Sequence, residues 1–422
     1  MEAASSCIEP RREMEESTFD IDKAQVVVSD DPEKIYEEYR YLRKHCPLAH
    51  TTQYGGYWLL TRYADVKRAA LDSATYISSV QAVVPSDPRG IRRPPLNFDA
   101  PAHTPFRTAL ARTLKPARLE RLAGPLQGHA EAQLRPLLDA GGGDVAAGFG
   151  ARYVARRGRD AATVTANSLV MYQIARDLLA DRRATPRDPE EDPASSLLLE
   201  RDAEGNPLSE EHLVGCLRQS LVVGVVAPPI LIGSICKHLA EDKALQRRLR
   251  GDESLLPAAL EEFVRLYSPY RGFARTVSRD VSFFSYPRRD DDEDDDRRQQ
   301  QPPAATITMI RPGEPVTLHY TSANRDPDVF ARPDDFVLHR DNVAMHMGFG
   351  RGRHRCVGMP LARLALETAL KVILRSTKDF EVDGPLQYSR MPELGIISCP
   401  MRFFCDDDGA ERSSPSSEAQ DY

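Results

Sequence analysis

The sequence predicts a mainly α-helical fold with small β-sheets, arranged as a single intertwined domain. Apolar residues recur with a helical period over several long stretches of the chain. Runs rich in branched and aromatic residues are short, and no linker-like stretch divides the chain between residues 31 and 405. These observations favour one α-rich body with minor β-sheets over a string of separate domains.

The elements are expected in the following order. A first helix lies within 31–47, where Ile35, Tyr39 and Leu42 fall on one face. A strand pair around Trp58 leads into a second helix, and an aperiodic stretch rich in Pro and Arg then forms a loop. The further helices are expected at 103–139, about 161–182, 209–250, 253–267 and 358–376, and the further strands at 305–310, 315–320 and 403–407.

The composition excludes several classes of protein. The 422 residues are 41% hydrophobic, which allows a large core, and the net charge of −7 provides no basic field for nucleic acid. The most apolar stretch, 217–242, is interrupted by polar residues and prolines, so we expect no membrane span. The charged, acidic N-terminus is unlike a signal peptide, and the seven scattered cysteines are typical of free thiols. A cytoplasmic location is expected.

Three segments are expected to lie outside the folded core. Residues 1–30 are predicted to be a flexible lead-in and residues 406–422 a flexible tail, which leaves 31–405 as the domain. Residues 288–303, RRDDDEDDDRRQQQPP, form a low-complexity acidic insertion that cannot bury apolar surface. We interpret it as a solvated connection between two strands; the alternative is a docking segment for a basic partner.

Cys356 carries the most specific chemical signal. It follows a turn rich in Gly, Arg and His and comes just before the helix expected at 358–376. Backbone donors, the helix dipole and nearby positive charge favour a thiolate there, and the glycines let the backbone pass close to a flat or bulky group. A thiolate in such a loop is a good soft metal ligand. Zinc would need further Cys or His ligands close by, and only His354 is near.

The stretch HMGFGRGRHRCVGMPLARLALE, residues 346–367, resembles the heme-ligand signature of the cytochrome P450 superfamily, F-G-x-G-x-H-x-C-x-G-x-x-L-A. The fixed positions match at Phe349, Gly350, Gly352, His354, Cys356, Gly358, Leu361 and Ala362. The resemblance extends over roughly residues 30–405 and implies the fold of the soluble, bacterial-type members. It also implies that Cys356 is the axial ligand of the iron in heme b, with Phe349, Gly350 and Gly358 beside the cofactor.

Other landmarks resemble the family's in the same order along the chain. EEFVR supplies Glu262 and Arg265, one helical turn apart, and NRDPDVFARPDDFVLHR supplies Arg340 as the third member of a structural ion-pair network. The resemblance further implies heme-binding roles, mainly at the propionates, for His103, Arg107, Arg275 and His354. Propionates carry negative charge into a partly buried site, where cations or hydrogen bonds must compensate it.

The function that this resemblance implies is that of a heme-thiolate monooxygenase oxidising a small organic substrate, of the kind found in secondary metabolism. A thiolate ligand makes the iron electron-rich and favours O–O cleavage. Electrons would come from a ferredoxin or another reductase partner in trans. The alternatives are a peroxide-using or non-oxidative heme-thiolate enzyme, or a heme- or ligand-binding protein that has lost turnover.

The chain departs from the family pattern in its long central helix. The usual A-G-x-(Asp/Glu)-Thr falls on residues 223–227, so that Val226 stands in place of the acid and Ala227 in place of the alcohol. In the family that pair steers protons to oxygen bound at the iron. The distal groove would here be formed by Gly224, Val226, Ala227 and Pro228, without an acid or an alcohol.

Two further departures concern backbone and length. Pro228 and Pro229 remove the amides that would bond the carbonyls of Gly224 and Val225 in a regular helix. We therefore expect a kink that holds water beside the iron. Between 150 and 171 only about twenty residues remain, so the helices that roof the substrate pocket in the family must be shortened or rearranged, unless a segment is missing from the gene model.

Overall fold

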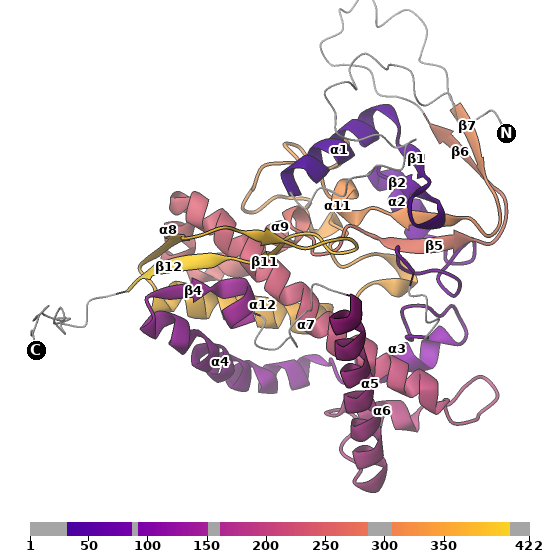
Figure 1. Ribbon diagram of the computed structural model, residues 1–422, viewed down its shortest axis with the longest axis horizontal. Coiled ribbons are helices and arrows are strands. Elements are labelled where there is room, and N and C mark those ends of the chain that lie inside the picture. Colours follow the sequence, from indigo (N-terminus) through magenta and orange to yellow (C-terminus); the bar gives the residue numbers. More distant parts are fainter. Residues whose placement is uncertain (1–31, 87–91, 151–160, 286–305, 406–422) are drawn as a thin grey trace, which may run out of the picture.

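The fold is described from a computed structural model, which covers residues 32–86, 92–150, 161–285 and 306–405. Helices make up the larger part of the molecule, and the largest sheet lies beside α1 and α2 (Figure 1). The prediction of a mainly helical fold with small sheets is confirmed. The expected lead-in, acidic insertion and tail fall outside the described residues.

The helices occur along the chain with connections of very different lengths. In order they are α1 (Pro32–His45), α2 (Tyr63–Leu71), α3 (His103–Arg112), α4 (Pro116–Asp139), α5 (Ala161–Ala184), α6 (Pro193–Leu199), α7 (Glu210–Glu241), α8 (Lys243–Gly251), α9 (Leu256–Leu266), α11 (Tyr320–Ala323) and α12 (Met359–Ser376). A π-helical turn, Val145–Gly150, follows β4 and packs on α7.

The strands form small sheets. Their bounds are β1 (Leu48–Thr51), β2 (Tyr57–Leu60), β3 (Tyr76–Ile77), β4 (Gly142–Asp144), β5 (Phe273–Val277), β6 (Val281–Ser285), β7 (Thr306–Ile310), β8 (Pro315–Leu318), β9 (Asp379–Val382), β10 (Gln387–Tyr388), β11 (Ile396–Ser398) and β12 (Pro400–Phe404). The largest sheet has the order β1-β2-β8-β5-β3, and a three-stranded sheet has the order β4-β12-β9. The pairs β6-β7 and β10-β11 complete the set for the described residues.

Two of the expected long helices are divided. The helix expected at 103–139 is α3 followed by α4, because Pro116 starts a new helix in its first turn. The helix expected at 209–250 is α7 followed by α8, because the side chain of Asp242 accepts from the backbone N–H of Leu245 and caps a new helix. Short α6 and β4 were not expected from the sequence, since neither has enough residues to show a period.

Helix α7 connects two hydrophobic cores. Its first half, with Val214 and Leu217, belongs to a cluster with α3, α5 and α6, here named the α3–α5 core. Its second half, with Leu231 and Ile235, belongs to a cluster with α4, α9 and α12, here named the α9–α12 core. Figure 1 shows α7 running from α5 and α6 at one end to α8 at the other.

The middle of α7 is open. Between residues 219 and 228 only Val226 is buried, whereas the turns on both sides are buried almost throughout. We call residues 219–228 the open stretch of α7. The helix keeps its α-helical assignment through Pro228 and Pro229, so the prolines do not interrupt it. The open stretch therefore lies between the two cores.

The second half of α7 is held by close backbone contacts. A Cβ added to Gly150 would lie 2.9 Å from the Cα of Pro229, and one added to Gly395 would lie 2.6 Å from the Cγ2 of Ile230. Only residues without a side chain allow these approaches, because real Cβ atoms do not come so close to other heavy atoms. The π-helical turn and the β11 region thus clamp α7 from Pro229 onward.

By length and composition alone, α7 also meets the requirements of a membrane span. Its most apolar window has a mean hydropathy of 1.8, and half of that window is buried inside the protein. A helix that joins two cores of a folded protein has this composition for a different reason, since both of its halves face apolar neighbours. We therefore regard α7 as a core helix.

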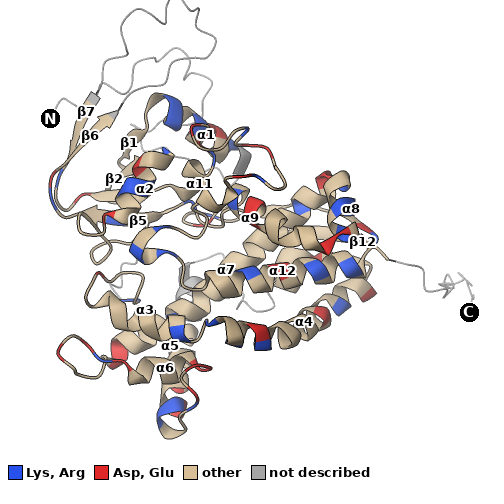
Figure 2. Cartoon of the chain, turned by 180° about the vertical axis from the view of Figure 1, so that it is seen from behind, with Lys and Arg blue, Asp and Glu red and all other residues tan. Residues whose placement is uncertain are grey.

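Charges of both signs are interspersed on α4, whereas the charged residues of α8 are all basic (Figure 2). The acidic insertion falls between β6 and β7, which pair in antiparallel register from Val281 opposite Ile310 to Ser285 opposite Thr306. The two ends of the undescribed segment are therefore held next to each other. The sequence position of the insertion, between two paired strands, fits the interpretation of a connection between strands.

Candidate functional site

The loop before α12 places Cys356 by backbone geometry. Gly350 and Gly352 have φ angles of 68° and 72°, which side chains disfavour. A Cβ on Gly352 would lie 2.0 Å from the carbonyl oxygen of Ala70, so the loop packs directly on α2. The backbone N–H of Cys356 donates to the carbonyl of Phe349 at 2.8 Å and closes the loop.

The residues beside Cys356 pack on different cores. Phe349 lies against the α9–α12 core and Val357 against the α3–α5 core. Cys356 itself is exposed, although residues on both sides of it are anchored. The open stretch of α7 connects the same two cores. Cys356 and the open stretch of α7 thus each lie, along the chain, between residues that pack on these two cores.

The surroundings of the thiol only partly meet the expectation. The backbone amides of Gly358 and Met359 and the charge of Arg107 act on Cys356 and lower its pKa, as expected. Although part of Cys356 is open to solvent, desolvation by the surrounding protein has the larger effect and raises the pKa of the thiol above its ordinary value. The expectation that this loop alone favours the thiolate is therefore wrong. A bound metal ion would add positive charge that favours the thiolate.

Two predicted propionate-binding residues form a buried histidine pair. The rings of His103 and His354 meet edge to face with centroids 4.8 Å apart, and the Nε2 atom of each has no hydrogen-bond partner among the described residues. Burial lowers the pKa of His103 to about 4 and that of His354 to about 3, and the charges of Arg107 and Arg275 respectively add to the effect. Both imidazoles are therefore neutral at pH 7 in the protein by itself.

The predicted arginines lie in the same place. Arg275 is only 3% exposed, and its Nη1 donates to the carbonyl of Ala274 at 2.6 Å. Arg107 donates from Nη1 to the carbonyl of Arg355, next to Cys356. The structure therefore brings together His103, Arg107, Arg275, His354 and Cys356, which come from three separate parts of the sequence.

These residues fit a heme. Two buried imidazole nitrogens without partners and a buried guanidinium call for a group that carries negative charge or accepts hydrogen bonds. The Cys356 thiol is a good soft ligand for a metal ion. Heme b combines an iron with two propionates, so it meets both requirements. Cys356 would hold the iron, and the histidine pair with Arg107 and Arg275 would hold the propionates.

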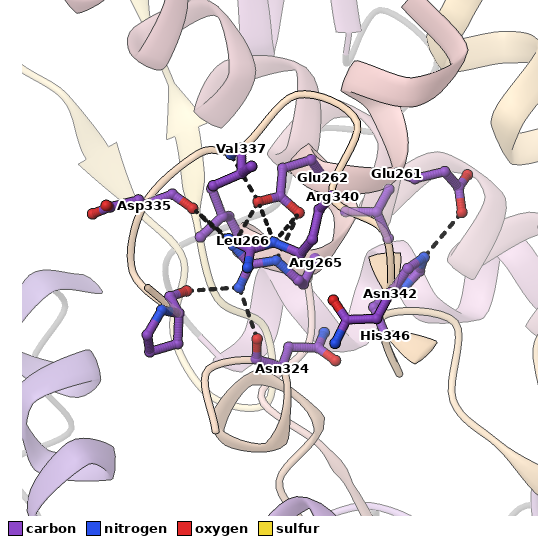
Figure 3. Close-up of polar contacts among 12 residues, drawn as sticks. Glu261, Glu262, Arg265, Leu266, Asn324, Asp335, Val337, Arg340, Asn342 and His346 are labelled. Carbon is purple, nitrogen blue, oxygen red and sulfur yellow. Dashed lines mark hydrogen bonds and ion pairs between the residues drawn. The ribbon is translucent and has the colours of Figure 1, made fainter. Parts of the chain in front are cut away.

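The predicted ion-pair network is assembled and buried (Figure 3). Arg265 donates from Nε and Nη2 to the two carboxylate oxygens of Glu262, both at 2.7 Å, and Arg340 donates from Nε to Glu262 at 3.0 Å. Burial would raise the pKa of Glu262, but the hydrogen bonds and charge of Arg265 lower it below its ordinary value. The network connects α9 to the segment that precedes the Cys356 loop.

Sequence reasoning missed a second brace beside the first. Glu261 accepts a contact from the His346 ring at 3.0 Å, and Arg363 of α12 donates two hydrogen bonds to it, both at 2.6 Å. The guanidinium of Arg363 also lies 5.3 Å from the centre of the Phe349 ring. These contacts hold the start of the loop and the helix after it on α9. The signal in the sequence was Glu261 itself, the acid next to Glu262. Local spacing could not connect it to His346 and Arg363, which lie 85 and 102 positions away.

The distal-groove residues lie in the open stretch of α7. Gly224 is exposed, Ala227 and Pro228 are half-buried, and Val226 is 6% exposed. A Cβ added to Gly224 would meet nothing within 4 Å among the described residues. The hydroxyl of Ser220, one turn away, is engaged with the carbonyl of Cys216 at 3.0 Å. This part of α7 therefore presents apolar side chains and backbone.

Comparison with known proteins agrees with this geometry. The cytochrome P450 family model matches residues 306–394. The chain is 26% identical to cyclomarin C epoxidase CymV of Salinispora arenicola, over 86% of this chain and 94% of the relative. It is 29% identical to cytochrome p450 CYP199A2 of Rhodopseudomonas palustris, over 87% and 90%. A 31% match to cytochrome P450 109 of Bacillus spizizenii spans less than half of that relative, 42%.

Solved structures share the fold. The Mycobacterium marinum cytochrome P450 CYP268A2 in complex with pseudoionone superposes with a TM-score of 0.75 at 23% identity, over 88% of this chain and 95% of that one. Cytochrome P450 CYP109Q5 from Chondromyces apiculatus gives a TM-score of 0.73 at 22% identity, over 91% and 98%. On its signature loop, its fold and these relatives, the chain belongs to the cytochrome P450 monooxygenase family.

Proposed function

We propose that this protein is a heme-thiolate oxidoreductase that oxidises a small organic substrate bound against the open stretch of α7. The observation that carries the proposal is the meeting of Cys356, His103, Arg107, Arg275 and His354 in one place. When bound, heme supplies redox chemistry at an iron made electron-rich by the thiolate. The protein supplies the ligand, the compensation of the propionate charge and an apolar wall.

Each residue has a role in this proposal. Cys356 holds the iron from a loop fixed on α2 and α9, so its position is set before the group binds. His103 and His354 would donate to the propionates from their Nε2 atoms, which have no hydrogen-bond partner among the described residues, and Arg275 adds a buried positive charge. Val226 and Ala227 exclude water without offering a proton.

The missing acid and alcohol support a second candidate. With valine and alanine at positions 226 and 227, α7 has no side chain there that delivers protons. A peroxide-using or non-oxidative heme-thiolate enzyme does not need this relay in the same way, and a heme-binding protein without turnover does not need it at all. These remain the alternatives to a dioxygen-dependent monooxygenase.

The partner and the setting follow from similar reasoning. Electrons would come from a ferredoxin or another reductase in trans. Bacterial-type members of the family use such a separate electron donor. A related protein is named as an epoxidase of cyclomarin C, which supports a substrate of secondary metabolism. The cysteines at 46, 216, 236, 356, 399 and 405 are free thiols, which fits a cytoplasmic location.

Spectroscopy of the purified protein tests the proposal. Reduction followed by carbon monoxide should give the strongly red-shifted Soret band of thiolate-bound heme. Consumption of NADPH with surrogate redox partners should then be compared with turnover supported by peroxide. A protein that binds no heme, or binds it without the thiolate band, contradicts the proposal. Heme binding without turnover in either assay selects the binding protein.

A further inference from the structure

A pocket of about 240 Å³ lies where three adjacent strands of the largest sheet come together. Strand β1 contributes His50, β2 contributes Trp58, and β8 begins at Pro315, directly after Glu314. His50 and Trp58 are opposite each other in the β1-β2 register, so their side chains lie on the same face of the sheet. The strands thus place an imidazole, an indole and a carboxyl group side by side.

Among the residues that the structure describes, the carboxyl group of Glu314 has hydrogen-bond donors but no cationic partner. Its Oε2 atom accepts from the Nε1 of Trp58 at 3.2 Å and from the backbone N–H of Arg311 at 2.6 Å. The guanidinium of Arg311 pairs instead with Asp280, at 3.3 Å. A half-buried negative charge without a counter-charge from the protein favours the binding of a cation.

The walls beside this carboxyl group are aromatic. The rings of His50 and Trp58 meet edge to face with centroids 4.7 Å apart, and Tyr57 also lines the pocket. No lysine or arginine of the described part of the chain lines it. The face of an indole ring attracts cations within about 6 Å of its centre, and aromatic walls of this kind recognise quaternary ammonium groups.

The pocket is small and open to solvent. Thr52 and Gly55, which both line it, are exposed. Gly55 has a φ angle of 90°, which side chains disfavour, and a Cβ added there would meet no described atom within 4 Å. Pockets for drug-sized ligands measure roughly 300–1,000 Å³. The volume of this pocket therefore suits a smaller molecule that enters past Gly55.

We propose that this pocket binds a small organic ammonium ion, with its positive charge between the Glu314 carboxylate and the Trp58 ring. The site is independent of the proposed function, because none of the residues that line it belongs to the candidate heme site. Attraction to the ring and attraction to the carboxylate are each modest. Together they should favour a cation over an uncharged molecule of the same shape by about tenfold in dissociation constant.

Choline tests the proposal against the uncharged alcohol in which a tert-butyl group replaces its trimethylammonium group. Trp58 is the only tryptophan of the chain, so tryptophan emission reports on this pocket alone. Both probes are titrated into the purified protein at constant ionic strength and about pH 8, where an ordinary histidine is neutral. Choline should change the emission saturably and bind about tenfold more tightly than the alcohol.

Glu314→Gln removes the charge but keeps a side-chain oxygen that can accept from Trp58 and Arg311, so the preference for choline should be lost. Glu381→Gln, on β9, makes the same change of net charge in another sheet. It is the matched control and should keep the preference. Circular dichroism and the melting temperature establish that both variants are folded.

Trp58→Leu provides a second test that keeps the carboxylate and removes the ring. Choline binding to this variant, followed by NMR of the choline methyl protons, should be at least about threefold weaker than to the wild type. The absence of a saturable response to choline in the wild type, or equal binding of choline and the alcohol, overturns the inference. A preference that Glu314→Gln retains, or unchanged choline binding in Trp58→Leu, overturns it as well. None of these results depends on the heme spectrum, so none of them bears on the proposed function.

Discussion

Cys356 is positioned by its neighbours more than by its own contacts. Its N–H is bonded to the carbonyl of Phe349, and the residue after it, Val357, packs on the α3–α5 core. The backbone N–H groups of Gly358 and Met359 donate to the Sγ atom of Cys356, and a serine oxygen can accept from the same two amides. Serine at this position therefore keeps the loop and removes only the sulfur.

The first prediction concerns this sulfur. Cys356→Ser should retain the fold but lose the red-shifted Soret band of the reduced carbon monoxide complex, since a serine oxygen is a poor substitute for a soft thiolate. Cys405→Ser, at another exposed free cysteine, is the control and should keep the band. A thiolate-type band in Cys356→Ser would show that the ligand lies elsewhere.

At the residue scale, the sequence predicted functional residues wherever the residues of a motif lie close together along the chain. Cys356 and His354 lie two positions apart in one loop, so their spacing alone identifies them. The pKa of Cys356 was misjudged because the donors are local but the burial is contributed by distant segments. Glu261 was missed because its partners, His346 before the loop and Arg363 after it, are 85 and 102 positions away in the sequence.

Helix α9 carries the buried ion pair that supports the loop of the site. Arg265 and Glu262 are fully buried, and Arg265 also donates to the carbonyls of Asn324, Pro333 and Asp335. Removing one partner leaves a buried charge or several carbonyls without a partner. The network thereby holds the segment that leads into the Cys356 loop.

The second prediction follows from this burial. Glu262→Ala and Arg265→Ala should each lower the free energy of unfolding by about 3–5 kcal/mol and give protein that is misfolded or free of heme. Arg402→Ala removes an ion pair whose arginine is 51% exposed and should change stability by less than about 1 kcal/mol. Chemical denaturation and the heme-to-protein ratio measure both effects. Normal heme content and unchanged unfolding in both buried-network variants would contradict the role of the network.

The third prediction concerns Glu261. Burial alone would raise its pKa, but His346 and Arg363 lower it to about 2, from an ordinary value of 4.5. A depressed carboxylate pKa stabilises the fold above about pH 4.5, and this contribution is lost as the pH falls from there to about 2. Glu261→Gln should therefore lose about 2–3 kcal/mol at pH 7 and show a flatter stability profile between pH 5 and 2. An acid-unfolding curve parallel to that of the wild type would count against this brace.

At the element scale, periodicity predicted most helices but not where they divide. The 3.6-residue pattern runs on across Pro116 and Asp242, although α3 and α4 pack in different cores, whereas the end of α7 and α8 pack in the same one. The divisions come from capping, which depends on one side chain or one missing amide. The continuity of α7 through two prolines could not be predicted either, since it depends on the clamp provided by Gly150 and Gly395.

The fourth prediction tests the molecule as a whole. Since Ser285 and Thr306 are paired, residues 286–305 can be replaced by Asn-Gly, a two-residue turn that suits an antiparallel hairpin. This variant should keep its heme content and its melting temperature to within about 4 °C. A larger drop would show that the acidic insertion contributes to the folded core. A loss of turnover with an unchanged melting temperature would instead favour the alternative of a docking segment.

The passage of α7 through two cores has a thermodynamic consequence. A polypeptide whose apolar clusters share one helix, with an exposed stretch between them, can unfold as two cooperative units with separate heat-absorption peaks. A ligand that touches both units joins them, and at a hundredfold excess over its dissociation constant it adds about 2.7 kcal/mol to the folded state. Scanning calorimetry of heme-free protein should therefore give two overlapping transitions that merge into one at a higher temperature on titration with hemin. A single heme-free transition, with equal calorimetric and van't Hoff enthalpies, would mean that the backbone of α7 alone transmits unfolding from one end of the molecule to the other.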